Sequence, residues 1–159
     1  MRLISGPLAL ILVAAGSTAY ADDAAFSLDA EIGVVSDYVF RGISQTQGEA
    51  AWQAGVTLTH ESGAYAGIWA SRVSYEGDSE TDVELDLYAG WSWSFEETSV
   101  DIAALSYFYP TGPEMNYDYT EFSARIAQAL GPVEVAGIVN MSPDGTADSG
   151  TYWGLAGEA

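Results

Sequence analysis

The sequence predicts an all-β protein, specifically an antiparallel up-and-down transmembrane β-barrel of which about eight strands are present. Three observations predict this fold. Apolar and polar residues alternate along successive segments, short and long connections alternate between the segments, and aromatic residues gather near the segment ends. Because side chains on a strand point to opposite faces with a period of two, each segment has one apolar and one polar face.

The chain begins with the pattern of a secretory signal peptide. Arg2 gives a positive start, an apolar run follows, and Ala19-Tyr20-Ala21 offers small residues at the two positions a signal peptidase reads. The apolar run is too short to cross a membrane as a helix. We predict a signal peptide over residues 1–21, cleaved before Asp22, and a β-barrel domain over residues 22–159.

The first three strands are predicted over residues 26–41, 51–61 and 64–75. In the first, the apolar row runs from Phe26 to Phe40 with Ser36 as its only polar member. The second ends at a tight turn, Ser62-Gly63, where glycine permits a positive φ. The third is the least regular. Its larger side chains fall on one row and Arg72 on the other, but Ile68 disturbs the contrast.

Residues 83–95 give the clearest strand, with a length suited to crossing a bilayer in a tilted barrel. Its apolar row is Val83, Leu85, Leu87, Ala89, Trp91, Trp93 and Phe95. Its other row is Glu84, Asp86, Tyr88, Gly90, Ser92 and Ser94. Further strands are predicted over residues 100–109, 119–130 and 133–142, and an eighth from residue 151 onward.

The connections alternate between long, polar segments and tight turns along the whole chain. Outer-membrane barrels are built in this way, with short periplasmic turns and longer external loops. We expect the chain to stop within a strand at Gly157-Glu158-Ala159, so the barrel would lack C-terminal strands. Conduction would then need those strands, or a homo-oligomer in which several chains share one barrel.

Charge limits the partners. The sequence has 4 basic and 23 acidic residues and no Cys. Cleavage after residue 21 removes Arg2 and no acid, so the net charge changes from −19 to −20. Such a chain repels phosphate backbones, and we exclude nucleic acid as a partner. Without Cys there is neither a disulfide framework nor a thiolate metal site.

The polar rows are predicted to line the lumen, where the carboxylates would be hydrated or paired with arginines. The predicted lumen and selectivity residues are Asp29, Glu31, Asp37, Arg41, Arg72, Glu84, Asp86, Asp101, Glu121, Arg125 and Glu134. An acidic lumen concentrates cations. The predicted membrane-interface aromatics are Tyr38, Phe40, Trp52, Tyr65, Trp69, Trp91, Trp93 and Phe95.

No catalytic constellation is recognised, and we expect the protein not to be an enzyme, with no cofactor and no metal site. The single histidine, His60, lies beside a turn, and no nucleophile elbow or phosphate-binding glycine loop occurs. Residues 76–82 and 144–148 carry oxygen ligands that suit weak Ca²⁺ binding. They lack the spacing of a calcium-binding helix–loop–helix, and we interpret them as acidic surface.

Three motifs carry a family resemblance. Residues 36–46 read Ser-Asp-Tyr-Val-Phe-Arg-Gly-Ile-Ser-Gln-Thr, residues 60–69 read His-Glu-Ser-Gly-Ala-Tyr-Ala-Gly-Ile-Trp, and residues 84–90 read Glu-Leu-Asp-Leu-Tyr-Ala-Gly. These resemble the proteobacterial family of outer-membrane porins known as TorF-type or Gcw_chp proteins. The resemblance implies an exported β-barrel of the Gram-negative outer membrane, assigned to passive transport, without catalytic residues to carry over.

The sequence therefore predicts a porin-like channel in contact with outer-membrane lipid, passing small hydrophilic solutes and preferring cations. Two alternatives stay open. One is a non-conducting structural or adhesive barrel that presents its loops to partners. The other is a periplasmic β-sandwich or lipocalin-like binding protein that uses the apolar rows as its core.

Overall fold

The computed structural model describes residues 12–14, 19–20, 25–112, 117–143 and 152–158. These residues form strands and no helix, so no described helix is long and apolar enough to span a membrane. The strands are β1 (Leu12–Ala14), β2 (Ala19–Tyr20), β3 (Phe26–Val35), β4 (Val39–Phe40), β5 (Ile43–Ser44), β6 (Ala51–His60), β7 (Ala64–Arg72), β8 (Val83–Phe95), β9 (Thr98–Phe108), β10 (Tyr119–Leu130), β11 (Val133–Met141) and β12 (Tyr152–Glu158).

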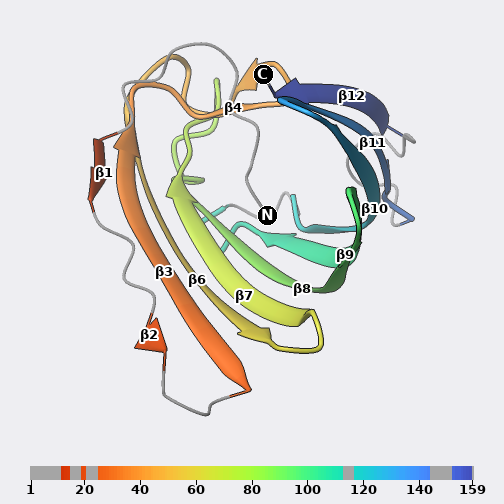
Figure 1. Ribbon diagram of the computed structural model, residues 1–159. Coiled ribbons are helices and arrows are strands. Elements are labelled where there is room, and N and C mark those ends of the chain that lie inside the picture. The colour runs from red at the N-terminus through yellow and green to blue at the C-terminus, as the bar shows by residue number, and fades with distance from the viewer. Residues whose placement is uncertain (1–11, 15–18, 21–24, 113–116, 144–151, 159) are drawn as a thin grey trace.

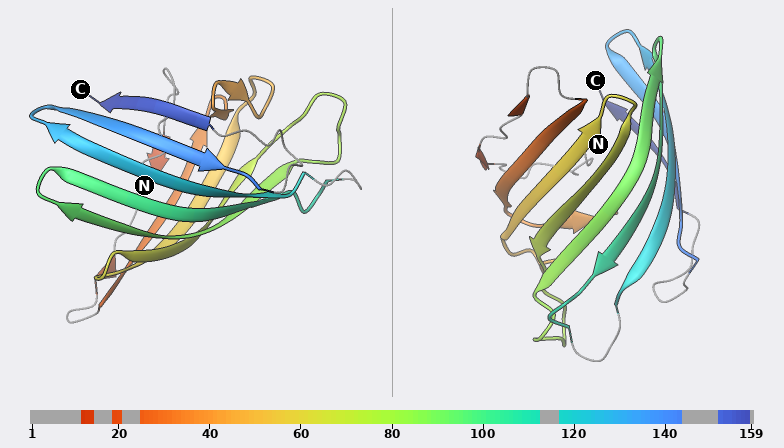
Figure 2. Two further views of the ribbon diagram at one scale, coloured as in Figure 1. Left: turned by 90° about the vertical axis from the view of Figure 1, so that its right-hand side faces the viewer. Right: turned by 90° about the horizontal axis from the view of Figure 1, so that it is seen from below.

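The main sheet is an antiparallel meander. Its order is β3-β6-β7-β8-β9-β10-β11-β12, and β1 and β2 pair with the outer edge of β3. Figure 1 shows the strands as a curved wall, and Figure 2 shows its twist from two further sides. Within the described strands β12 does not pair with β3. The all-β, antiparallel prediction is confirmed, and the sheet is open rather than a closed barrel.

The alternation of connections is also confirmed. Tight turns join β6 to β7, β8 to β9 and β10 to β11, whereas the other links between neighbours in the meander are longer. Gly63 and Gly131 have φ values of 90° and 68°, which the turns require and a side chain disfavours. The long connections therefore gather at one end of the sheet, and the tight turns at the other.

The sheet has two chemically different faces, as the period of two predicts. On the convex face large apolar side chains from neighbouring strands lie side by side: Val34 is opposite Trp52, Val56 opposite Ile68, and Ile68 opposite Leu87. The row continues across β9, β10 and β11 through Ile102, Phe122, Ile126 and Val139, each of which is at least 40% exposed. This face is thus an apolar surface without a covering layer among the described residues.

The first predicted strand is too long. β3 ends at Val35, and residues 39–44 form a separate antiparallel pair, β4–β5. The position of the β4–β5 pair above the hollow of the sheet is visible in Figure 1. Ser36, the polar residue within the apolar row, marks the point where the chain leaves the sheet. The segment turns inward because its polar groups bond to one another and to the concave face, as described below.

The phase of the third strand is also corrected. Ile68 on β7 is 43% exposed on the convex face, whereas Trp69 is 8% exposed. Tyr65 and Trp69 therefore lie on the concave face, and Arg72 shares the outward phase of Ile68. The two large aromatic side chains of this strand favour the opposite phase. On the outward row Ala66 and Ala70 are small, so Ile68 is the residue that indicates the observed phase.

Most of the large buried side chains lie at the loop end of the concave face, whereas the small buried Ala127 and Ala136 lie near the turn between β10 and β11. Those at the loop end include the apolar side chains of Trp69, Val73 and Tyr107, together with three carboxylates, Glu84, Asp86 and Glu121. Further along the same face, glycines make room for aromatic rings. A Cβ on Gly67 would overlap the Tyr88 ring. The protein's core is thus a polar and aromatic filling of a curved sheet.

Candidate functional site

The candidate site begins with a short hairpin folded into the hollow of the sheet. We call residues 37–46 the inner hairpin. Its two-residue turn is Arg41-Gly42, with φ values of 50° and 86°. Both residues are left-handed, as a type I′ turn requires. For arginine this conformation costs about 1–2 kcal/mol, so the surrounding contacts must hold it in place.

Hydrogen bonds inside the hairpin come from the polar residues of its motif. Asp37 accepts hydrogen bonds from the hydroxyls of Ser44 and Thr46, at 2.6 and 2.8 Å. The backbone N–H of Gln45 donates to the backbone carbonyl of Tyr38 at 2.6 Å. Thr46 is fully buried. Asp37, predicted to line the lumen, therefore holds the two arms of this hairpin together through these hydrogen bonds.

Arg41 anchors the hairpin tip to the far side of the sheet. Its guanidinium donates to both carboxylate oxygens of Glu121 on β10, at 2.8 and 2.7 Å. Glu121 is 3% exposed. The Arg41 guanidinium also lies 4.5 Å from the Phe40 ring centroid, and Phe40 contacts Tyr107 edge-on at 6.0 Å. Burial acts to lower the pKa of Arg41, but the hydrogen bond and charge of Glu121 raise it overall.

Glu84 on β8 is held by two phenols. Tyr38 of the inner hairpin donates to Oε1 at 2.8 Å, and Tyr109, just after β9, donates to Oε2 at 2.6 Å. Glu84 is 2% exposed. Burial and the neighbouring Glu84 charge raise the pKa of both tyrosines above the ordinary value. Two charge-assisted hydrogen bonds therefore stabilise a carboxylate that is not ion-paired with any arginine of the described residues.

Asp86 lies beside this clamp and is less well satisfied. In register it stands opposite Trp69 on β7 and Tyr107 on β9, so its cross-strand neighbours are both aromatic. The Tyr38 ring packs edge-on against Trp69 at 5.4 Å. Asp86 is 7% exposed, and its Oδ1 has no hydrogen-bond partner within the described part of the chain.

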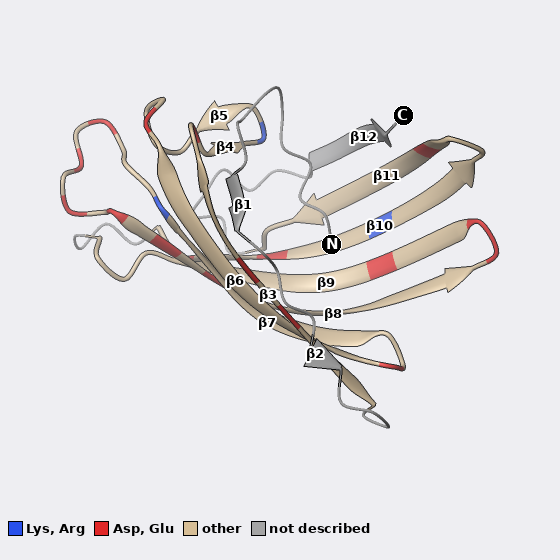
Figure 3. Ribbon diagram, turned by 60° about the vertical axis from the view of Figure 1, so that its left-hand side comes forward, with Lys and Arg blue, Asp and Glu red and all other residues tan. Residues whose placement is uncertain are grey.

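The other end of the concave face carries polar pairs without a covering segment from the inner hairpin. Tyr65 donates to Asp101 at 2.9 Å, and Tyr88 shares a 2.5 Å hydrogen bond with Thr57. Arg125 on β10 forms an ion pair with Glu134 on β11. Figure 3 shows that charged positions lie along the strands as well as in the loops.

Most predicted lumen residues share the concave face. The structure brings together Asp29, Glu31, Glu84, Asp86, Asp101, Glu121, Arg125 and Glu134 on the concave rows of β3 and β8 to β11. Arg72 is the exception. It points outward at the end of β7 and donates to Glu49 at 2.8 Å, in a loop pair that is partly exposed. The reversed phase of β7 accounts for this error.

The eight aromatic residues predicted for the membrane interface fall into two groups that face opposite sides of the sheet. Trp52, Trp91, Trp93 and Phe95 are exposed on the convex face, on the row that was predicted for them. Tyr38, Phe40, Tyr65 and Trp69 were assigned to the same apolar rows, and this orientation is wrong. Inside the curve the Tyr38 ring contacts Trp69, and the Phe40 ring contacts Tyr107. The hydroxyls of Tyr38 and Tyr65 bond to Glu84 and Asp101. The tyrosines face inward because each hydroxyl has a carboxylate to bond.

The prediction also omitted residues that complete the site. Tyr107 and Tyr109 were not named as site residues, and Tyr109 proves to be a partner of Glu84. Their position on the row of Asp101 was the available signal. Thr46 gave no comparable signal, because its role depends on the fold of the inner hairpin.

The acidic loop 76–82 is organised by its own side chains. Asp78 accepts hydrogen bonds from the Thr81 hydroxyl at 2.6 Å and from the Glu80 amide at 2.9 Å. The hydrogen bond from Thr81 is the main reason that the pKa of Asp78 is lowered. Among the described residues no group of three His, Cys, Asp or Glu has metal-binding geometry. Residues 144–148, the second acidic loop, lie outside the described residues.

Comparison with known proteins gives a family and no closer relative. A family model described as "Bacterial protein of unknown function (Gcw_chp)" matches residues 19–153. No curated protein and no solved structure matches the chain.

Proposed function

The chain belongs to the Gcw_chp family of bacterial proteins, and from this premise we propose that it is an outer-membrane β-barrel channel that passes small hydrophilic solutes and prefers cations. The observation that carries the proposal is the two-faced sheet. Its convex face is apolar and exposed, and its concave face carries carboxylates.

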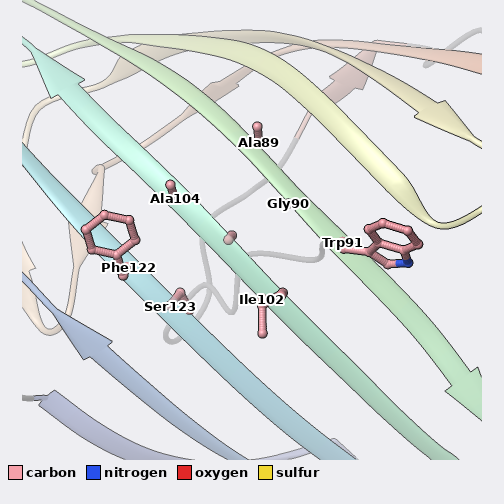
Figure 4. Close-up of a pocket in the computed structure, with 8 residues that line it drawn as sticks. Ala89, Gly90, Trp91, Ile102, Ala104, Phe122 and Ser123 are labelled. Carbon is pink, nitrogen blue, oxygen red and sulfur yellow. The ribbon is translucent and has the colours of Figure 1, made fainter.

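The convex face supports contact with lipid. Monomeric soluble proteins rarely expose continuous apolar patches beyond a few hundred Å². Here the exposed apolar row crosses neighbouring strands from β3 to β11. A shallow apolar depression lies between Trp91 and Phe122, where Ala89 and Ala104 are the small residues of the row (Figure 4). Acyl chains suit such a surface, and water does not.

The concave face supports a preference for cations. Its carboxylates outnumber its arginines, and both Arg41 and Arg125 are already in ion pairs. A lumen with excess negative charge raises the local concentration of cations and repels anions. In this proposal Glu84, Asp86 and Glu121 govern selectivity, because they lie together beside the inner hairpin.

The inner hairpin supports a constriction at the loop end. It leaves the end of β3 and is bonded to Glu121, although four strands of the meander separate β3 and β10. Solutes that enter from this end would pass the hairpin. The same feature favours the second candidate function, a non-conducting barrel whose interior is filled by the hairpin and by paired side chains.

The β-sandwich alternative receives less support. A sandwich buries its apolar rows between two sheets, but the apolar row of the described sheet is exposed. A channel in turn requires the sheet to close. Closure by further strands or by additional copies of the chain is part of the proposal.

The experiment uses the complete gene product, folded in detergent. A membrane barrel should migrate faster on a gel before heating than after it, and it should conduct in a planar bilayer with a cation-selective reversal potential. Glu84→Gln and Asp86→Asn together should reduce that selectivity. A protein that stays in solution without detergent contradicts the membrane location, and a folded barrel that carries no current contradicts the channel.

A further inference from the structure

We propose that Asp86, together with Trp69, Tyr107 and Tyr38, forms a binding site for a primary ammonium group in the lumen. The ligand class is a small R–NH₃⁺ cation. This inference rests on the proposed function, because it names the kind of solute that the acidic part of the channel recognises.

The first observation is the unsatisfied state of Asp86. The side chain is 7% exposed, yet Oδ1 receives no hydrogen bond within the described part of the chain. A buried carboxylate without a partner is unfavourable by several kcal/mol. Glu84 and Glu121, the neighbouring buried carboxylates, each have hydrogen-bond donors. Asp86 therefore differs from them in lacking a donor, and a bound ammonium would supply one.

The second observation is the set of aromatic walls. Trp69 and Tyr107 stand directly opposite Asp86 on the two flanking strands, where cross-strand Cα atoms are about 4.5–5.5 Å apart. Tyr38 reaches the same place from the inner hairpin and contacts Trp69. Aromatic faces attract cations through the ring quadrupole, by about 0.5–2 kcal/mol each. A carboxylate between such rings suits an organic cation.

The third observation is that each arginine among the described residues is already paired with a glutamate other than Asp86. Arg41 is bound to Glu121, Arg72 to Glu49 and Arg125 to Glu134. The chain contains no lysine. Because the arginines of the described sheet are already paired, we expect a cation from solution to neutralise Asp86.

The donor set favours an ammonium group over a metal ion. Calcium needs six to eight oxygen ligands, and no described group of three acidic or histidine side chains has metal-binding geometry. Both oxygens of Glu84 already accept phenol hydrogen bonds. A primary ammonium needs fewer ligands, since it donates up to three hydrogen bonds and its remaining surface contacts the rings.

The test compares methylammonium, tetramethylammonium and K⁺ on the complete, folded protein. Tetramethylammonium has the same charge but no N–H donor. We expect methylammonium to permeate in preference to both other ions, and Asp86→Asn to lower its permeability relative to K⁺ by roughly tenfold, the loss expected for one charged hydrogen bond. Trp69→Leu should lower it by roughly threefold through the lost ring contact.

Asp101→Asn is the matched control. It removes the same charge from the same face, but Asp101 is paired with Tyr65 and lies six residues from Tyr107 along β9, about 20 Å away by the rise of a strand. Its methylammonium-to-K⁺ ratio should equal that of the unmodified protein. Equal ratios in the Asp86→Asn and unmodified proteins would overturn the proposal, as would equal preference for tetramethylammonium.

A binding measurement separates this inference from the channel itself. Methylammonium should change the fluorescence of the detergent-folded protein, and the change should disappear in Asp86→Asn and diminish in Trp69→Leu. If the protein carries no current but this response is present, the channel proposal fails and the ammonium site stands. If it conducts and the response is absent, the site fails and the channel stands.

Discussion

Arg41 donates two parallel hydrogen bonds to Glu121, although 80 residues separate them in the sequence. The pair joins the tip of the inner hairpin to β10 across the hollow of the sheet. Because Glu121 is buried and Arg41 has a left-handed backbone, the contact holds both a desolvated charge and a strained turn in place.

Breaking this pair should destabilise the loop end of the protein. Arg41→Gln leaves Glu121 buried without its cation and should reduce the free energy of unfolding by about 3–5 kcal/mol. Glu121→Gln should have a similar effect, and the double variant should lose less than the sum of the two. Urea unfolding of the four proteins in detergent measures this coupling. Strictly additive losses would contradict a direct interaction.

The two phenols on Glu84 should contribute more than a phenol bonded to a neutral group. Tyr38→Phe and Tyr109→Phe each remove a hydrogen bond to a buried carboxylate and should lower the free energy of unfolding by about 1.5–3 kcal/mol. Tyr88→Phe, the control, loses a hydrogen bond to the neutral Thr57 and should lower it by about 1 kcal/mol. Equal losses in all three variants would mean that Glu84 is not charged.

The glycines under the aromatic rings should not tolerate a methyl group. Gly67→Ala would overlap the Tyr88 ring, and Gly90→Ala would overlap Tyr65. Each should lower the free energy of unfolding by about 1–3 kcal/mol. Gly137→Ala is the control, because its Cβ would meet Ile126 Cγ2 at 3.9 Å, an ordinary contact. A loss in Gly137→Ala as large as in the other two would exclude ring overlap as the cause.

Alkaline pH should loosen the inner hairpin and its surroundings. Burial raises the pKa of Tyr75 to about 12 from 10.0, and it raises the pKa of Tyr38 and Tyr109 in the same direction. Above pH 10 the unfolded chain loses these protons before the folded one does, so the free energy of unfolding falls as pH rises through this range.

Absorbance of tyrosinate during a pH titration measures this effect. Tyrosines with ordinary pKa values should ionise near pH 10, and the buried group should ionise later, together with unfolding. Tyr38→Phe should remove part of the late phase. A single phase near pH 10 for every tyrosine would contradict the burial of the three phenols.

Tryptophan residues on the two faces should respond differently to lipid. Trp91 is 48% exposed on the convex face, whereas Trp69 is 8% exposed on the concave face. In variants that retain one tryptophan each, brominated lipid should quench Trp91 strongly and Trp69 weakly. Equal quenching would contradict the proposed orientation in the membrane, and quenching of neither would contradict membrane insertion itself.

Several elements were predictable because they depend on neighbouring residues only. β8 spans Val83–Phe95, the predicted range, since its alternation is uninterrupted over that length. The tight turns at Gly63 and Gly131 were predictable because a positive φ favours glycine. The rows that carry Glu84, Asp86 and Glu121 follow from the same period of two.

The errors occur where alternation gives no unique answer. On β7 the side chains of Trp69 and Ile68 are both hydrophobic, and only the curvature of the sheet decides which lies on the convex face and which lies beside Asp86. At Ser36 the apolar row continues through Tyr38 and Phe40, so the pattern predicts a strand although the chain turns inward.

The amino-acid order alone thus determines the strands, their two faces and the alternation of short and long connections, since each depends on contacts between neighbours in the chain. The tertiary structure decides which buried carboxylates have partners. Arg41 meets Glu121 and Tyr38 meets Glu84 only because the inner hairpin folds into a curved sheet. Asp86 remains without a donor for the same reason, because no arginine or phenol hydroxyl of the described fold reaches its Oδ1.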